Sequence, residues 1–296
     1  MFVDGKYAAN RKCGARTIGR TDCPQTCVRT PSQERGKVTP LAFCAPFEID
    51  IVTALAEQLV SAFTELEVAT LTPEHISQVP KAQGVYHLYR NGTLVYVGKA
   101  DDLRSRLDDH RYKISGRRNI DGSEISFNCL TVHKNWTALA PETSLIAHYK
   151  KQAGVCEWNG NGFGIHDPGR NREETNKEPD GFDSQFEIRE DWPCTWIDAS
   201  EWNALKLLIK MKEELPFLLR YQTLEKMKYR SGHPAYNDVT ISVPQSGMAA
   251  SELLRLIAQH TPGWQATRFP GHMIFYEENR NYTHGTIIWH QPAVGQ

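Results

Sequence analysis

The chain lacks any long apolar run, since none of its 296 residues fall in a hydrophobic stretch approaching the roughly 18 residues that a membrane-spanning helix requires. Its N-terminus also lacks the apolar core of a secretory signal peptide. Net charge is scarce as well, because 34 Lys and Arg are balanced by 35 Asp and Glu. This balance argues against a protein that coats nucleic acid non-specifically.

Cysteine is sparse, with seven residues in the whole chain. An odd number, in a chain too long to depend on disulfides for stability, predicts a reducing, cytoplasmic environment. Four cysteines near the N-terminus raise the alternative of a zinc site, but they lack the short C-x₂-C spacing of structural zinc sites. Unpaired thiols are the favoured interpretation for these four, which are Cys13, Cys23, Cys27 and Cys44.

Three segments of different composition define the expected domains. Residues 1–42 are basic and lack apolar periodicity, which indicates a flexible arm. Residues 43–230 carry the motifs described below and predict a small antiparallel three-stranded sheet flanked by helices. Residues 231–296 alternate strand and helix patterns without a recognisable motif. The expected fold class is therefore α+β, with a C-terminal α+β appendage of unknown role.

Helices are predicted at several places in the central region. Apolar periodicity indicates one over 46–63, and Pro141 is suited to open another at its first turn. Asp198 and Glu201 resemble a capping box for the helix that follows. Pro216 is expected to start or kink a further helix, to about residue 229.

A β-hairpin over 84–98 carries two tyrosines near conspicuous glycines. Asn91-Gly92 lies between its strands and is a strong turn signal. A strict two-residue loop would pair Arg90 with Thr93 and put the two tyrosines on opposite faces. We therefore predict a three-residue loop, which pairs Arg90 with Leu94 and places Tyr86 and Tyr96 on one face.

The helix expected from about 102 to 111 carries Arg106 and His110 on the same stripe as its leucines. Charged groups on an apolar stripe are costly unless they are paired or face a ligand. Glu142 presents a similar case, because apolar residues follow it at helical spacing. A carboxylate in that position favours a hard divalent cation as its partner.

Each of these features alone is more often structural: core tyrosines, a surface Arg–His pair and an acidic first turn of a helix. In this order and spacing they suit phosphodiester cleavage, which requires an activated nucleophile and stabilisation of a negatively charged phosphate. The stretch from Lys81 to Arg118 holds nine Lys and Arg against four Asp. A local basic surface is therefore expected around the motif.

The chain here resembles the GIY-YIG nuclease superfamily, whose motif is present as Gly84-Val85-Tyr86 and Tyr96-Val97-Gly98. The superfamily's lysine, arginine, histidine and metal-binding glutamate correspond to Lys99, Arg106, His110 and Glu142. The chain is most similar to the type II restriction endonucleases, because Trp158-Asn159 precedes Gly162-Phe163-Gly164. In those enzymes an asparagine after a tryptophan joins the active site, which corresponds to Asn159.

The resemblance implies a metal-dependent hydrolysis of DNA. One Mg²⁺, for which Mn²⁺ can substitute, would be held by Glu142. Tyr86 would act as general base, Tyr96 would orient the water or the phosphate, and Arg106 would neutralise phosphoryl oxygens. The products would carry 5′-phosphate and 3′-hydroxyl ends.

The same resemblance implies double-stranded DNA as substrate, a homodimer on a palindromic target and a cognate DNA methyltransferase. Several cations are expected to contact DNA, although a solvated loop is an equally good interpretation for each. These are Arg104, Arg111, Arg117, Arg118, Lys134, Arg170 and Arg172.

Two alternatives remain open. One is a structure- or single-strand-specific nuclease in repair or phage defence, which the short step from Lys99 to Arg106 favours. The other is a DNA-binding module without catalysis, which the presence of Tyr86, Arg106 and Glu142 disfavours.

Overall fold

The computed structural model describes residue 43 and residues 50–133, 141–150, 155–164, 173–174, 181–224 and 228–292. The expected arm over 1–42 and its cysteines lie outside the described residues, as do Lys134, Arg170 and Arg172. Clustering of contacts separates Met1–Ile49 from Asp50–Gln296, and the following concerns the second unit. No helix in the described part of this chain is both long and apolar enough to cross a membrane.

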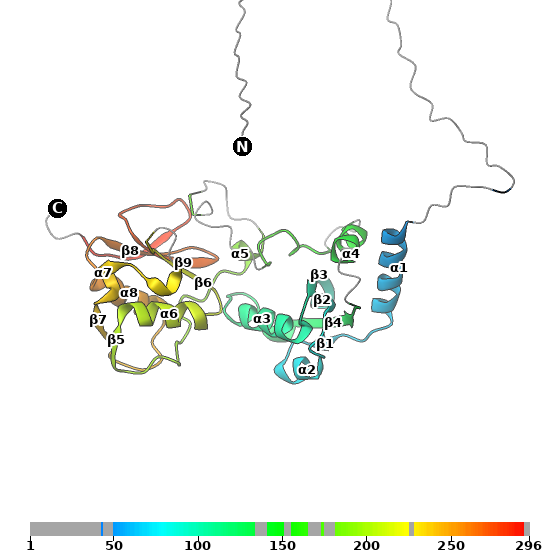
Figure 1. Cartoon of the computed structure of the whole chain (residues 1–296), viewed down its shortest axis with the longest axis horizontal. Helices are drawn as coiled ribbons and strands as arrows, with labels where there is room; N and C mark the ends of the chain where they lie inside the picture. The colour runs from blue at the N-terminus through cyan, green and yellow to red at the C-terminus, as the bar shows by residue number, and fades with distance from the viewer. Residues whose placement is uncertain are drawn as a thin grey trace, which may run out of the picture. The chain divides into compact units, whose positions relative to one another are not determined.

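An antiparallel sheet forms the centre of the motif-bearing region (Figure 1). Its strands are β1 (Ala69–Thr70), β2 (Gly84–Arg90), β3 (Thr93–Ala100) and β4 (Ile125–Thr131), in the order β1-β4-β2-β3. The predicted three-stranded antiparallel sheet is confirmed, and the short β1 adds a fourth strand beside β4. This order leaves β3 as an edge strand.

The turn between β2 and β3 differs from the prediction. Arg90 pairs with Thr93, so the loop has two residues and the three-residue prediction is wrong. Asn91 and Gly92 both adopt positive φ, 48° and 81°, as the tight hairpin turn suited to Asn-Gly requires.

A β-bulge nevertheless places the two tyrosines on the same face of the sheet, as predicted. The register shifts between Leu88 and Tyr89, so that Leu88 pairs with Tyr96 and Tyr86 pairs with Gly98. One extra residue on β3 moves every later side chain to the other face. Tyr86 and Tyr96 therefore share a face, for a reason that the sequence pattern did not contain.

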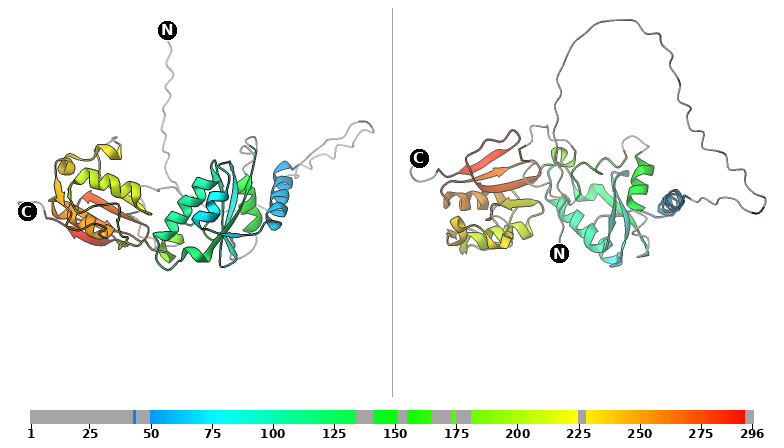
Figure 2. Two further views of the ribbon diagram at one scale, coloured as in Figure 1. Left: turned by 90° about the horizontal axis from the view of Figure 1, so that it is seen from below. Right: turned by 45° about the horizontal axis from the view of Figure 1, so that its top comes forward.

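Helices cover both faces of this sheet (Figure 2). α2 (Pro73–Gln78) and α3 (Leu103–Ser115) pack on the face of Tyr86 and Leu88, while α1 (Ile51–Thr64) and α4 (Pro141–Tyr149) pack on the face of Val85 and Val97. α1 starts five residues later than predicted, and α3 extends four residues further, to Ser115. The Asp102 carboxylate accepts a hydrogen bond from the Ser105 backbone N–H at 3.1 Å and caps α3.

Two predictions for the middle of the chain are wrong. Residues Glu201–Asn203 form strand β5, and Asn203 rather than Asp198 caps α6 (Ala204–Glu214). Beyond Pro216 the chain forms strand β6 (Leu218–Tyr221) instead of a helix, because β6 pairs in parallel with β9 (His272–Glu277). Long-range strand pairing thus overrides the local helical pattern.

The C-terminal sheet has the order β10-β8-β9-β6, with β8 (Trp264–Arg268) and β10 (Thr286–His290) completing it. β7 (Thr240–Ser242), α8 (Ala250–Gln259), β9 and β10 follow the mixture of strand and helix patterns expected for residues 231–296. The short helices α5 (Phe182–Gln185) and α7 (Pro234–Asn237) complete the α-helices of the described residues. One hydrophobic core runs from Ile188 to Phe275. Residues of α6 and β6 contribute to this core, and the domain boundary expected at 230 stays a prediction.

Candidate active site

The open edge of β3 is covered by residues 155–164. The backbone N–H groups of Cys156 and Trp158 donate to the carbonyls of Leu94 and Val95, at 2.9 and 3.0 Å. Because β3 is an edge strand, these contacts satisfy groups that would otherwise lack partners. The loop after α4 is thereby held beside the tyrosine-bearing hairpin.

The side-chain amide of Asn159 holds this loop against β3 through hydrogen bonds of both its oxygen and its nitrogen. Its Oδ1 accepts from the Val97 N–H at 2.9 Å, and its Nδ2 donates to the Val97 carbonyl at 2.8 Å. The side chain is 7% exposed. Asn159 was expected to join the active site, and in the structure its side-chain amide binds β3.

A groove of about 580 Å³ lies where β3, α3, α4 and this loop meet. It is lined by all seven residues predicted for the catalytic site. The remaining lining residues are Ile146, Lys150, Gly160, Gly162 and Gly164. Side chains far apart in the sequence are thus gathered into one concave surface, as a candidate active site requires.

Tyr86 and His110 form a buried hydrogen bond in this groove. The Tyr86 hydroxyl lies 2.7 Å from Nε2 of His110. Gly98 faces the tyrosine ring across the hairpin, and a Cβ there would lie 2.3 Å from the Tyr86 hydroxyl. Glycine is therefore required opposite Tyr86 for the ring to occupy this position.

Burial determines the charge states of the pair. It raises the pKa of Tyr86 well above its usual range. Burial, with the charges of Lys113 and Arg106, lowers the pKa of His110 to about 3. Both side chains are therefore neutral near pH 7, and the neutral imidazole can accept a hydrogen bond from the phenol.

Phe163 shields His110 from solvent. Its ring stacks on the imidazole at a centroid distance of 4.7 Å and an interplanar angle of 18°. Lys113 donates to the Phe163 and Gly162 carbonyls at 2.7 and 3.3 Å, which fixes the backbone of this loop. Sequence reasoning had noted the Gly162-Phe163-Gly164 stretch without predicting this contact.

Glu142 lies half-buried in the groove near two cations. Burial raises the pKa of its carboxyl group, and the charges of Lys99 and Arg106 oppose this rise. No hydrogen bond or ion pair joins the carboxylate to another described residue. The nearest acid to Arg106 is Asp109, whose Oδ2 lies 3.9 Å from NH1.

The donor set around Glu142 fits a hard divalent cation. Mg²⁺ is typically bound by one or two carboxylates and completes its octahedron with water and substrate oxygens. The described residues contain no cluster of three or more His, Cys, Asp or Glu side chains suited to a metal. A single carboxylate open to a groove therefore matches Mg²⁺ bound jointly with a phosphate, rather than a closed structural site.

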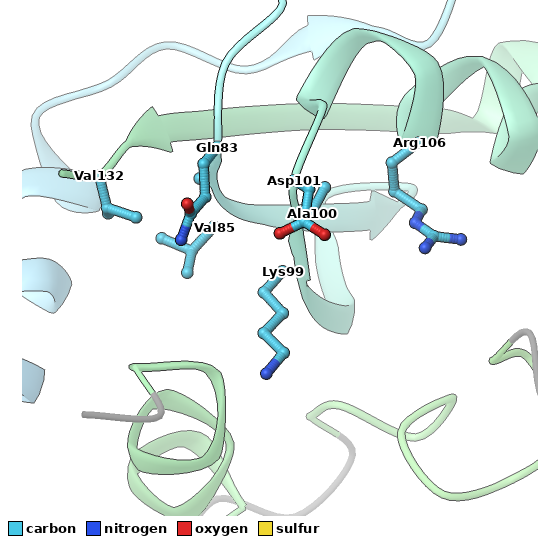
Figure 3. Close-up of a pocket in the computed structure, with 8 residues that line it drawn as sticks. Gln83, Val85, Lys99, Ala100, Asp101, Arg106 and Val132 are labelled. Atoms are coloured by element: carbon cyan, nitrogen blue, oxygen red, sulfur yellow. The ribbon is translucent and has the colours of Figure 1, made fainter. Parts of the chain in front are cut away.

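A second, smaller pocket of about 240 Å³ adjoins the groove and shares Lys99 and Arg106 with it. Gln83, Val85 and Asp101 contribute to its lining. Figure 3 shows the Lys99 and Arg106 side chains extending away from the strand and the helix that carry them. Both cations are accessible to an anionic ligand.

The arginines that were predicted to contact DNA lie in different environments. Arg117 is buried, and its NH1 pairs with Asp183 Oδ1 at 2.9 Å, with side-chain exposures of 3% and 6%. This burial argues against a DNA contact by Arg117, which stays a prediction. Arg118 NH2 lies 3.3 Å from Asp191 Oδ1, although its side chain stays 43% exposed.

Two further arginines lie outside the groove. Arg104 Nε donates to the Val79 carbonyl at 2.7 Å, and Arg111 Nε pairs with Asp108 Oδ1 at 2.8 Å. Both line a separate pocket of about 520 Å³ together with Lys81. DNA binding by Arg104 and Arg111 stays a prediction.

Comparison with known proteins identifies the region that holds this groove. Residues 79–184 match the family model described as the Eco29kI GIY-YIG domain. These residues form a GIY-YIG domain. The domain indicates a DNA endonuclease, and it accounts for the tyrosine–glycine hairpin and the helix that follows it.

Two known proteins are similar to part of this chain. UvrABC system protein C of Acidobacterium capsulatum is 36% identical over 88 residues, which are 28% of this chain and 14% of that protein. The chain thus spans a small part of that relative's length. The GIY-YIG N-terminal endonuclease domain of UvrC from Thermotoga maritima, a point mutant bound to its catalytic divalent cation, is 22% identical. It covers 31% of this chain and 93% of the solved chain, with a TM-score of 0.22.

Sequence reasoning missed one cation of the groove. Lys150 lines it together with the predicted residues. The signal was available, because Lys150 follows Glu142 by eight residues and Ile146 by four, which places all three on one helical face.

Proposed function

We propose that the protein is a metal-dependent, sequence-specific type II restriction endonuclease that hydrolyses phosphodiester bonds of double-stranded DNA. The observation that carries the proposal is the groove itself. It gathers a buried tyrosine–histidine pair, two accessible cations and a carboxylate that has no partner among the described residues. The match to the Eco29kI domain supports the restriction branch.

Tyr86 and His110 supply the proton path in this mechanism. The attacking water gives a proton to the Tyr86 oxygen while the phenolic proton passes to Nε2 of His110, 2.7 Å away. The lowered pKa of His110 leaves that nitrogen unprotonated near pH 7 and makes it a weak base, so it passes the proton on to solvent. The water oxygen bonds to phosphorus as the bond to the 3′ oxygen breaks, which leaves 5′-phosphate and 3′-hydroxyl ends.

Positive side chains stabilise the charge that develops on the phosphate. Arg106 can donate two parallel hydrogen bonds to phosphoryl oxygens, and Lys99 adds a compact charge. Tyr96 lines the groove beside them and would orient the water or the phosphate. Glu142 would hold the divalent metal, Mg²⁺ or Mn²⁺ in its place, which would neutralise a non-bridging oxygen and the leaving oxygen.

Further parts of the proposal concern partners and place of action. Cutting both strands with one groove per chain favours a homodimer on a palindromic target. A restriction enzyme also requires a cognate methyltransferase to protect host DNA, and cytoplasmic action follows from its substrate. Each of these is open to direct measurement.

Incubation of the purified protein with unmethylated duplex DNA of phage length and Mg²⁺, beside Glu142→Ala, tests the proposal. Discrete fragments that share a palindromic end sequence, and that disappear with the variant, are the expected result. Cutting only of branched or single-stranded DNA would instead support a repair or defence nuclease, to which the UvrABC system protein C match also points. Binding without cleavage in Mg²⁺ or Mn²⁺ would identify a DNA-binding module.

A further inference from the structure

Lys150 occupies an unusual place for a surface lysine. It lies directly after α4 and lines the groove that holds Tyr86, Arg106 and Glu142. Among the described residues, its Nζ donates one hydrogen bond, to the Asn159 carbonyl at 3.4 Å. No carboxylate among the described residues pairs with it. Its charge is therefore available to a ligand in the groove.

We propose that Lys150 binds a DNA phosphate that flanks the scissile one, so that the groove holds the strand at two phosphates. The inference rests on the proposed endonuclease function and adds a second phosphodiester subsite to it.

The helical spacing separates Lys150 from the reacting phosphate. Eight residues at about 1.5 Å of rise place Lys150 about 12 Å from Glu142 along the helix axis. One DNA strand carries a charge about every 3.4 Å of its axis. Lys150 therefore serves a different phosphate from the one that Glu142 and Arg106 address.

The loop beside Lys150 leaves room for a nucleic-acid backbone. Gly160 and Gly164 both line the groove, and a Cβ at either would meet no atom within 4 Å. Gly160 has a φ of 81°, which favours glycine at this position. A chain with phosphate at Lys150 can pass over this side-chain-free surface.

A structural explanation for Lys150 also exists. A cation at the end of a helix interacts favourably with the helix dipole, and the bond to Asn159 ties α4 to the loop. Such a role would change the stability of the protein. A structural role would not change the salt dependence of DNA affinity, because the slope of that dependence reflects the number of phosphates that the protein neutralises.

The test uses the full chain and a duplex containing the mapped cleavage site. Glu142→Ala serves as the background for binding, so that no cleavage occurs, and Lys150→Ala and Lys150→Arg are compared in it. Lys206→Ala is the matched control, because Lys206 is an exposed lysine of α6 that does not line the groove. Duplexes with a single neutral methylphosphonate at each position beside the cut locate the phosphate.

Lys150→Ala is expected to weaken binding about tenfold, the equivalent of one charge-assisted contact. The slope of log K against log salt should fall by about 0.9. A methylphosphonate at one position should weaken DNA binding by the Glu142→Ala protein. The same methylphosphonate should not weaken binding by the protein that carries both Glu142→Ala and Lys150→Ala. Lys150→Arg should restore the slope, and Lys206→Ala should leave it unchanged.

Several outcomes would overturn the inference. One is an unchanged salt slope and unchanged methylphosphonate sensitivity in Lys150→Ala, with wild-type protein cutting duplex DNA; the endonuclease proposal would then stand alone. A loss of affinity that Lys150→Arg does not restore, with a lowered unfolding temperature, would establish the structural role instead. If wild-type protein cuts no duplex, the proposed function fails and the inference fails with it.

Discussion

The Tyr86 hydroxyl lies 2.7 Å from Nε2 of His110, and both side chains are 1% exposed. Their burial keeps the phenol and the imidazole neutral near pH 7, since it shifts the two pKa values in opposite directions. A neutral hydrogen-bonded pair is less costly in a poorly solvated site than a charged pair would be. The histidine of the motif is thus placed to serve the tyrosine rather than the phosphate.

Tyr86→Phe is expected to lower the single-turnover cleavage rate by about 10²–10⁴-fold, because general base catalysis typically contributes that factor. The ring remains, so the unfolding temperature should change little. Tyr89→Phe is the matched control, since its hydroxyl donates to Asn128 Oδ1 at 3.3 Å and does not line the groove. Equal cleavage rates for the two variants would remove Tyr86 from the chemistry.

Gly98→Ala is expected to reduce cleavage roughly 100-fold, because a small displacement of a reacting group can cost that much. The new Cβ would lie 2.3 Å from the Tyr86 hydroxyl and 2.8 Å from a ring carbon of Tyr96, so the tyrosines must move. Gly122→Ala offers a control, because no atom lies within 4 Å of its Cβ. Measured rates on one duplex should separate the two variants, and similar rates would contradict this account of the hairpin.

The hairpin shows how far the sequence predicts the site. The prediction that Tyr86 and Tyr96 share a face is confirmed, and Asn91-Gly92 located the turn. The predicted loop length was wrong, because a bulge between Leu88 and Tyr89 and not a longer loop brings the two tyrosines to one face of the sheet. A bulge on a strand of ordinary residues leaves no local signature, so only the folded pairing reveals it.

The arginines show where sequence reasoning stops. Arg117 and Arg118 are adjacent and chemically identical, yet one is buried and the other is largely solvated. The difference comes from Asp183, whose approach depends on the tertiary fold. By contrast, Lys150 could have been found from its helical spacing to Glu142.

Arg117→Ala is expected to destabilise the protein by about 3–5 kcal/mol, because it leaves the Asp183 charge buried without its partner. Arg118→Ala should cost less than about 1 kcal/mol, as exposed ion pairs do. Urea unfolding of both variants measures the difference, and Asp183→Ala combined with Arg117→Ala should recover part of the loss. If Arg117→Ala has normal stability and weakened DNA binding, the result would support a DNA contact by Arg117.

Stability is expected to fall as the pH drops from 7 to 5, because two buried histidines resist protonation. Burial lowers the pKa values of His87 and His110 to about 3. In this pH window the unfolded chain binds protons at these residues, with a pKa near 6.5, and the folded chain does not. The stability present above that unfolded pKa is therefore lost on acidification, by about 2 kcal/mol per histidine at pH 5.

Urea unfolding at pH 7, 6 and 5 measures this loss, and His87→Phe isolates one of its two sources. The His87 ring stacks on Phe63 at a centroid distance of 3.6 Å, and its buried Nε2 has no hydrogen-bond partner in the part of the chain that the structure describes. Phenylalanine can keep the stacking and removes the titrating group, so the pH dependence should fall by about half. His260→Asn, at an exposed position, should leave the dependence as in wild type. The same pH dependence in His87→Phe as in wild type would show that His87 is protonated in the folded protein, with its ring open to water.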